Sequence, residues 1–201
     1  MIIVFFLILG GVSTSAQDID FNPKSLDKDL KKLWETDVIA LSEIAIPDSL
    51  YHDILLDKGK IFCASGSGQD LGFAYVGRIF SCRAGGCGGD QDVAGVSSSE
   101  DYEYFDYFII FDLNLSVQKI RVYNYQATHG HEVGGKGWLK QFIGYQGKEK
   151  LEYGKNIDSI SGATISANAI TYNVQESCRY LSLIKALLEN SCGTSRAMVS
   201  N

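Results

Sequence analysis

The residues best suited to chemistry lie toward the C-terminal end of the chain, where positions 158–164 have the sequence Asp-Ser-Ile-Ser-Gly-Ala-Thr. A helical pattern follows directly. We expect Ser161 to cap this helix, Gly162 to let the chain bend and the small Ala163 to leave space above the helix start. Amide groups in the first turn of a helix lack partners within the helix and lie at the positive end of its dipole, so they suit a phosphate. Thr164 would present its hydroxyl there.

The specificity of this segment depends on its length. Ser-Gly-Ala-Thr alone is typical of an ordinary capped turn. The longer pattern Asp-x-x-Ser/Thr-Gly-Ala-Ser/Thr is expected by chance in about one chain of this length per thousand, given average residue usage. The full segment therefore indicates a functional site.

The segment resembles the flavin-attachment motif of the FMN-binding domain family, found in the C subunit of the sodium-pumping NADH:quinone oxidoreductase, the G subunit of the Rnf complex and related secreted flavoproteins. In that family a flavin transferase joins the phosphate of FMN to the hydroxyl of the motif's last Thr or Ser. The resemblance implies covalent FMN on Thr164. It also implies that Asp158, Ser161, Gly162 and Ala163 belong to the pattern that the transferase recognises.

A second family feature lies upstream, where members have Glu-Thr-Pro-Gly-x-Gly before an aromatic residue and a Gln-Phe-x-Gly step. Here residues 131–138 are His-Glu-Val-Gly-Gly-Lys-Gly-Trp and residues 141–144 are Gln-Phe-Ile-Gly, so the Thr and Pro are absent. The resemblance covers about residues 58–190. It implies a glycine-rich loop that approaches the flavin, with His131, Glu132, Gly135 and Gly137 as cofactor-binding residues.

His129 and His131 are the residues that would suggest a metal site as an alternative. In an extended backbone both imidazoles would lie on the same side, as a metal pair requires. The sequence supplies no clear third ligand, so we expect no metal and favour a contact between His131 and the flavin.

The five cysteines are too scattered for a paired-cysteine zinc framework. Cys82 and Cys87 enclose a short loop with two glycines, flexible enough to close a structural disulfide in an oxidising compartment. A redox-active pair that passes electrons to the flavin is the alternative. Cys178 and Cys192 pair if the tail folds back, and Cys63 is then left over, buried in its strand.

The N-terminus has the features of a secretory signal. Residues 2–9 are apolar, and Thr14 and Ala16 occupy the −3 and −1 positions of a cleavage site. Residues 2–12 would reach about 17 Å as a helix, against about 30 Å of hydrocarbon, so they cannot span a membrane. We expect a signal peptide over residues 1–16 and a periplasmic or extracytoplasmic mature chain without a membrane span. No Lys or Arg precedes the apolar run, which leaves a buried core element as the alternative.

The mature chain divides by pattern into three parts. Residues 17–57 form a predicted N-terminal helical extension: a helix opened by Asn22 and Pro23 that runs to about Glu35, a strand at 38–46 and a helical turn at 49–56. Residues 58–192 form the FMN-binding domain, with hairpins over 61–81 and 104–125, a loop at 84–100 and a short helix at 138–143. Residues 193–201 form a tail.

The last helix shows the strongest periodicity in the chain. Its predicted buried face consists of Ala167, Ile170, Val174, Cys178, Leu181, Ile184 and Leu188, and its stop is expected at Asn190 and Gly193. We therefore predict an α+β fold: a bent antiparallel sheet of two hairpins, covered by helices on one side, with a long C-terminal helix.

Charge and composition exclude several classes of function. The 201 residues are 45% apolar, which excludes a disordered chain, and the formal net charge of −6 supplies no field that would attract nucleic acid or anionic lipid. The leading hypothesis is an extracytoplasmic electron carrier whose partners are a flavin transferase and redox donor and acceptor proteins or a membrane electron-transport complex. The alternatives are an FMN-dependent reductase of a small substrate and a flavin-free binding module.

Overall fold

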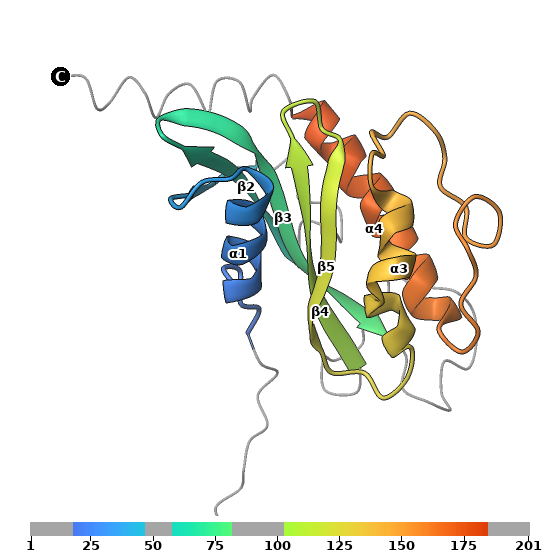
Figure 1. Ribbon diagram of the computed structural model, residues 1–201. Helices are drawn as coiled ribbons and strands as arrows, with labels where there is room; N and C mark the ends of the chain where they lie inside the picture. Colours follow the sequence, from blue (N-terminus) through green and yellow to red (C-terminus); the bar gives the residue numbers. More distant parts are fainter. Residues whose placement is uncertain (1–17, 47–57, 82–102, 185–201) are drawn as a thin grey trace, which may run out of the picture.

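The computed structural model describes residues 18–46, 58–81 and 103–184. Five antiparallel strands form one sheet in sequence order: β1 (Ala40–Glu43), β2 (Gly59–Gly66), β3 (Gln69–Ser81), β4 (Glu103–Asp112) and β5 (Val117–Tyr125) (Figure 1). The helices are α1 (Lys24–Leu33), the 3₁₀ turn η2 (His131–Gly134), α3 (Lys136–Leu139), the 3₁₀ turn η3 (Lys140–Phe142) and α4 (Thr164–Leu183). This arrangement confirms the predicted α+β class and the long C-terminal helix.

Both predicted hairpins are present. Strands β2 and β3 are joined by Ser67 and Gly68, which both have positive φ (51° and 76°), as a two-residue turn of type I′ requires. At the turn between β4 and β5, the Asp112 carboxylate accepts the backbone N–H groups of Asn114 and Ser116, each at 2.9 Å. Local turn chemistry therefore fixes where each hairpin reverses.

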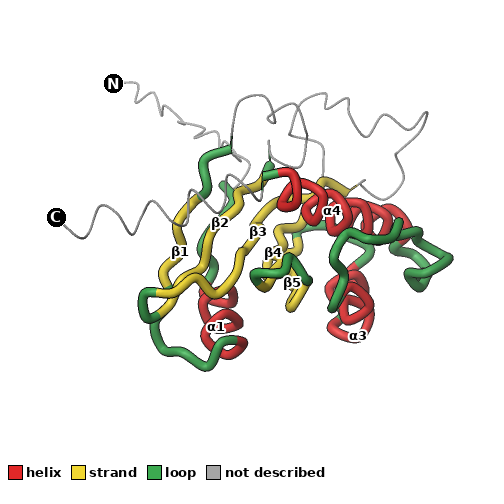
Figure 2. Tube along the Cα trace, turned by 90° about the horizontal axis from the view of Figure 1, so that it is seen from above, coloured by secondary structure: helices red, strands yellow, loops and turns green. Residues whose placement is uncertain are grey.

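The sheet is covered on both faces, which corrects the expectation of a single covered side. Figure 2 shows the sheet between α1 and α4. The alternation along the strands explains this: Phe73 and Tyr75 pack toward α4, whereas Ala74 and Val76 pack toward α1. Since both alternating sets are apolar, each face needs a cover.

Helix α1 differs from the prediction at its start. Its N-cap is Pro23, and no side chain caps it, so the expected cap by Asn22 is wrong. Instead, the N–H of Asn22 donates to the Asp20 carboxylate at 3.0 Å. The helix is held on the sheet by its buried residues Leu26 and Leu30.

The rest of the N-terminal extension also joins the sheet. The predicted strand over 38–46 is shorter than expected, and as β1 it pairs with β2 at the edge. The extension thus adds a strand to the sheet as well as a helix to one face.

Helix α4 has the predicted buried face. Ala167, Ile170, Val174, Cys178, Leu181 and Ile184 are each at most 2% exposed and belong to the main core. Within the three described ranges no helix is both long enough and apolar enough to cross a bilayer.

Several predicted features lie outside the described residues. They are the signal peptide over 1–16, the helical turn at 49–56, the loop at 84–100, Cys82, Cys87, Leu188, Cys192 and the tail over 193–201. The end of α4 is described: the helix ends at Leu183, before the stop predicted at Asn190 and Gly193.

Candidate functional site

The segment Asp158–Thr164, which we call the helix-start segment, leads directly into α4. Thr164 is the first residue of the helix and its side chain is exposed. The N–H of Ala167 donates to the carbonyl of Ala163 at 2.9 Å, so the three amides of Thr164, Ile165 and Ser166 precede the first intrahelical bond. The hydroxyl of Thr164 therefore lies at the positive end of a 20-residue helix.

The residues before Thr164 take other roles than predicted. Ala163, not Ser161, is the N-cap, and its side chain makes no capping hydrogen bond. Ser161 is exposed, so the expected cap by Ser161 is wrong. Ala163 is 3% exposed and packs into the core, where the prediction had it leaving space. Burial of its methyl group anchors the backbone one residue before the exposed hydroxyl.

Gly162 bends the chain as predicted. Its φ of +79° lies in the left-handed region, which favours glycine. A Cβ placed there would meet no atom of the described residues within 4 Å. The N–H of Ala163 closes the turn by donating to the Ile160 carbonyl at 3.3 Å.

Two side chains from the preceding helical segment hold the backbone of Asp158. The Gln141 Oε1 atom accepts the N–H of Asp158 at 2.8 Å, and the indole Nε1 of Trp138 donates to the Asp158 carbonyl at 2.8 Å. The carboxylate of Asp158 is exposed. The upstream family feature and the helix-start segment, about 20 residues apart in sequence, are thus in direct contact.

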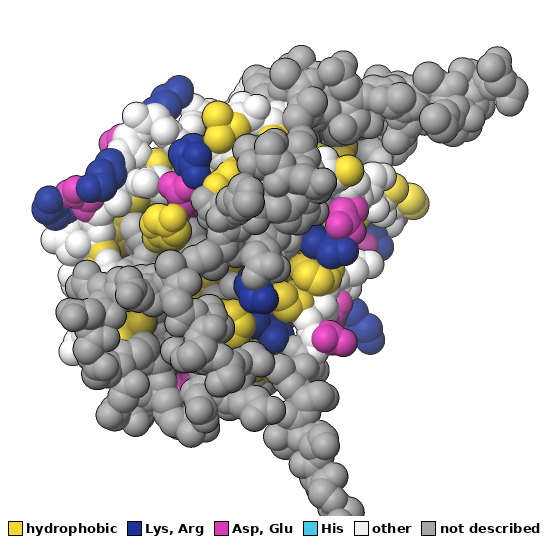
Figure 3. All heavy atoms as spheres, turned by 180° about the vertical axis from the view of Figure 1, so that it is seen from behind, with side chains coloured by type: hydrophobic (Ala, Val, Ile, Leu, Met, Phe, Trp, Pro, Cys, Tyr) yellow, Lys and Arg dark blue, Asp and Glu magenta, His cyan; other side chains and the backbone are white. Residues whose placement is uncertain are grey.

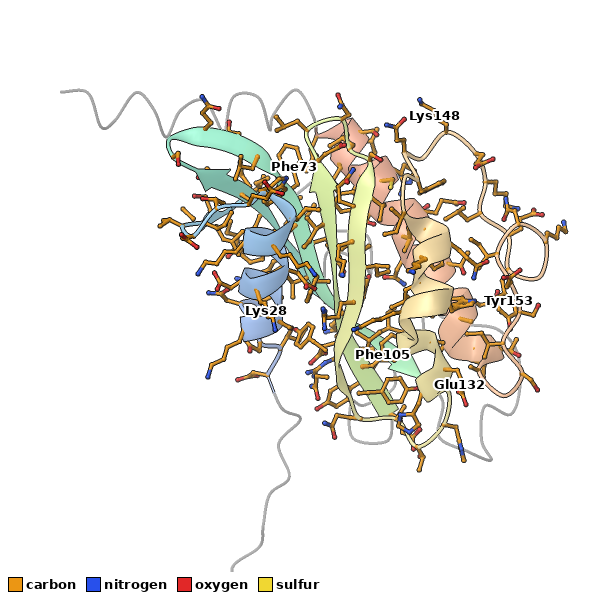
Figure 4. The ribbon with its side chains drawn as sticks, viewed as in Figure 1. Lys28, Phe73, Phe105, Glu132, Lys148 and Tyr153 are labelled. Atoms are coloured by element: carbon orange, nitrogen blue, oxygen red, sulfur yellow. The ribbon has the colours of Figure 1, made fainter. Side chains whose placement is uncertain are left out.

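A third side chain, which the sequence analysis did not predict for the site, is hydrogen-bonded to the next part of the segment. The hydroxyl of Tyr153 accepts the N–H of Ile160 at 2.8 Å and donates to the carbonyl of the same residue at 3.1 Å. Figure 4 shows Tyr153 on the outer side of α3. Only its position just before a glycine distinguishes Tyr153 in the sequence, and that signal is too weak to assign a role.

His131 and Glu132 open the turn η2 beside the start of α4, and both are exposed. The buried Gly130 lets the backbone before η2 pack closely against Tyr125 and Ser166. A Cβ at this position would lie 3.0 Å from the Tyr125 hydroxyl and 3.1 Å from Ser166 Oγ. In Figure 4, Glu132 lies at the same end of the molecule as Phe105. The structure therefore brings His131 and Glu132 to the end of the molecule where α4 begins.

Tyr125 forms the floor of this region. Its ring packs on His131, with centroids 4.4 Å apart, and stacks on Phe105 at 5.4 Å. Burial raises the pKa of Tyr125, and the negative charges of Glu132 and Glu103 raise it further. Tyr125 therefore stays protonated at neutral pH and donates to the His129 carbonyl.

The two histidines do not have the predicted geometry. Gly130 between them is left-handed (φ 86°, ψ 20°), so the backbone is not extended and does not place both rings on one side. Within the described ranges, no three or more His, Cys, Asp or Glu side chains are grouped to hold a metal ion.

The glycines of the upstream loop have separate roles. Gly135 is the N-cap of α3, and a Cβ there would lie 2.8 Å from the Glu132 carbonyl oxygen, so the close backbone contact requires glycine. Gly137 is exposed within α3, and no atom of the part of the chain that the structure describes lies within 4 Å of its Cβ position.

The cysteines correct two predictions. Cys63 is disulfide-bonded and is not the leftover thiol. Cys178 is free and buried, so it does not pair with Cys192. Burial raises the pKa of the Cys178 thiol to about 12, which makes it inert at neutral pH.

Residues 105–178 match the family model described as the FMN-binding domain. The match runs from β4 into α4 and includes the whole helix-start segment, η2 and α3. No curated protein matches the chain.

Proposed function

We propose that FMN is bonded to Thr164 as a phosphoester and that the protein is an electron carrier outside the cytoplasm. The proposal proceeds from the match of residues 105–178 to the FMN-binding domain model. The observation that carries the proposal is the position of Thr164. Its exposed hydroxyl lies in the first turn of α4, inside the matched region.

The residues around Thr164 fit a phosphate and a flat ring. The first-turn amides of α4 and the helix dipole favour a negative phosphate. Among the described residues, nothing lies within 4 Å of the Cβ positions of Gly162 and Gly137, and His131 and Glu132 are exposed at this end of the molecule. His131, Glu132, Gly135 and Gly137 are the proposed contacts for the flavin, and the attached group supplies the redox chemistry.

Attachment requires an activated donor, because forming a phosphate ester from free FMN in water has no driving force. Flavin adenine dinucleotide supplies one in its phosphoanhydride. Thr164 Oγ forms a bond to the phosphorus of the FMN half, the P–O bond of the anhydride breaks, and AMP leaves while the hydroxyl proton passes to a base. The redox state does not change, and the protein gains FMN less one water. A flavin transferase is the proposed catalyst.

An extracytoplasmic location explains why the flavin would be covalent. Outside the cytoplasm a dissociable cofactor is lost by dilution, whereas an ester on Thr164 is retained. The proposed signal peptide over residues 1–16 supports export. The disulfide at Cys63 supports an oxidising compartment.

The exposure of the site favours a carrier over a reductase. Thr164, His131 and Glu132 all lie at the surface, so donor and acceptor proteins could approach the flavin directly. A reductase would also turn over a specific small substrate. Rates of the isolated, flavin-loaded protein with a reduced donor separate the two functions, because a carrier shows no substrate-specific rate.

Co-expression with a flavin transferase tests the attachment. Intact mass should show wild-type chain and Thr164→Ser heavier by FMN less one water, and Thr164→Ala unmodified. Because Thr164 is exposed, neither variant should disturb the fold. A modified Thr164→Ala chain would contradict the proposed residue, and a colourless wild type beside an active transferase would support a flavin-free binding module.

A further inference from the structure

We infer that Tyr153 and Gln141 are positioning residues for the modification of Thr164, because their side chains fix the backbone of the helix-start segment in the shape that the transferase engages. The inference rests on the proposed function. Neither residue belongs to the attachment motif itself.

The backbone of the helix-start segment is hydrogen-bonded to side chains, whereas the backbone of a strand or helix is hydrogen-bonded mainly to other backbone groups. The N–H of Asp158 donates to Gln141, and the carbonyl of Asp158 accepts from Trp138. The N–H of Ile160 donates to the hydroxyl of Tyr153, and the same hydroxyl donates to the carbonyl of Ile160. Between residues 158 and 160, four backbone polar groups are therefore satisfied by three side chains from outside the segment.

The side chains of the motif point the other way. Asp158, Ser161 and Thr164 are all exposed, while the core residues Ile157 and Ala163 anchor the segment at either end. A fixed backbone with its polar side chains outward is preorganised for an enzyme that reads those side chains. Preorganisation lowers the ordering cost that binding must overcome.

Tyr153 is itself rigidly placed. Its loop closes through the N–H of Gly154, which donates to the Ile157 carbonyl at 2.7 Å, and Gly154 has a φ of +78°. The Asn156 side chain accepts the N–H of Glu152 at 2.7 Å and donates to the Lys150 carbonyl at 2.8 Å. The hydroxyl of Tyr153 is thus carried on a closed loop that can define the position of Ile160.

Tyr153→Phe removes the hydroxyl and keeps the ring, and Gln141→Leu removes the amide acceptor. The wild-type chain and each variant are incubated separately with the transferase and flavin adenine dinucleotide. Each variant should have a kcat/KM for flavin attachment roughly ten-fold lower than that of the wild type, from the loss of one or two hydrogen bonds. Most of the loss should be a higher KM for the protein, because the transferase must then order the segment on binding.

Matched controls make the same chemical changes elsewhere. Tyr145→Phe removes a hydroxyl that donates to the Glu149 carbonyl at 2.7 Å, and Gln118→Leu removes an amide that donates to Asp112 at 2.9 Å. Both controls should keep the wild-type kcat/KM. A variant that merely misfolded would lower the fraction of chain modified at long times, and its KM, calculated from the modifiable fraction alone, would equal the wild-type value. The plateau therefore separates folding from positioning.

The outcomes distinguish the two proposals. If the wild type accepts no flavin, the proposed function fails and this inference falls with it. If the wild type is modified and both Tyr153→Phe and Gln141→Leu react with the wild-type kcat/KM, the inference alone is overturned. Amide hydrogen exchange gives a readout without flavin: the Ile160 N–H should exchange faster in Tyr153→Phe than in Tyr145→Phe.

Discussion

At the scale of single residues, the site depends on a sharp change in burial between Ala163 and Thr164. The methyl of Ala163 is in the core and the hydroxyl of Thr164 is at the surface. The motif predicted the exposed hydroxyl and the bend at Gly162. It did not predict the N-cap, because the demand to bury Ala163 decides where the helix begins, and that demand comes from partners distant in sequence.

Gly130→Ala should destabilise the protein and disturb the site. The φ of +86° disfavours any side chain, and the new methyl would press on the Tyr125 hydroxyl and Ser166 Oγ. We expect a loss of about 1–2 kcal/mol in the free energy of unfolding, measured by denaturant titration. Gly137→Ala is the control: its Cβ meets no neighbour and alanine favours a helix, so it should be neutral or slightly stabilising. Equal losses in both variants would contradict this account.

At the scale of elements, the spacing of apolar residues predicted the helix α4 correctly, whereas the expectation that helices cover only one face of the sheet was wrong. The spacing in α4 predicted its buried aliphatic and cysteine residues Ala167, Ile170, Val174, Cys178 and Leu181, because one face of a 3.6-residue repeat must be apolar. It did not predict that Ser166, Thr171, Glu176, Ser177 and Tyr180 are buried as well. The pattern of β3 and β4 indicated strands but not two covered faces, because an aromatic run is also compatible with a half-exposed face. Tyr153 could not be found, because its role depends on a loop closure with no periodic signal.

Ile170→Ala in α4 should cost about 2–5 kcal/mol, because the side chain is fully buried and its removal leaves a cavity. Ile165→Ala, on the exposed face of the same helix and 52% exposed, should change the free energy of unfolding by about 0.5 kcal/mol at most. Urea titrations of the two variants give the comparison. Similar costs would show that the buried face has been misassigned.

The ion pair between β3 and β4 gives a second test at this scale. Arg78 donates to both oxygens of Asp106, at 2.7 and 3.1 Å, and both side chains are buried. Burial acts to lower the pKa of Arg78, but hydrogen bonds to Asp106 outweigh burial and raise it, so the guanidinium stays charged. Asp106→Ala leaves that charge buried and should cost about 3–5 kcal/mol in thermal or urea unfolding. Arg78→Met combined with Asp106→Ala should recover part of the loss; a double variant less stable than Asp106→Ala would contradict this reasoning.

At the scale of the whole molecule, charge and ionisation set the conditions under which the fold persists. The described acidic and basic side chains are interspersed on the face shown in Figure 3, and the net charge of the chain is −6. Burial raises the pKa of Cys178 to about 12 and that of Tyr145 to about 12. These buried neutral groups stabilise the folded state only while they keep their protons.

Stability should therefore fall at alkaline pH. In the unfolded chain Cys titrates near 8.5 and Tyr near 10. Because the folded pKa values are raised, the contribution is complete below about pH 8 and is lost as pH rises toward 12. Free energies of unfolding from urea titrations at pH 8, 9.5 and 11 should decrease in that order. Cys178→Ala should flatten the first interval; a stability that rises with pH would contradict the assignment.

The most direct test of the central claim is a peptide map of the chain after co-expression with a flavin transferase. Trypsin cuts after Lys155 and Arg179, so Thr164 lies in the peptide Asn156–Arg179. We predict that this peptide alone is yellow and that fragmentation places FMN, less one water, on Thr164. An unmodified peptide, or flavin on Ser161 or any other residue, would contradict the account.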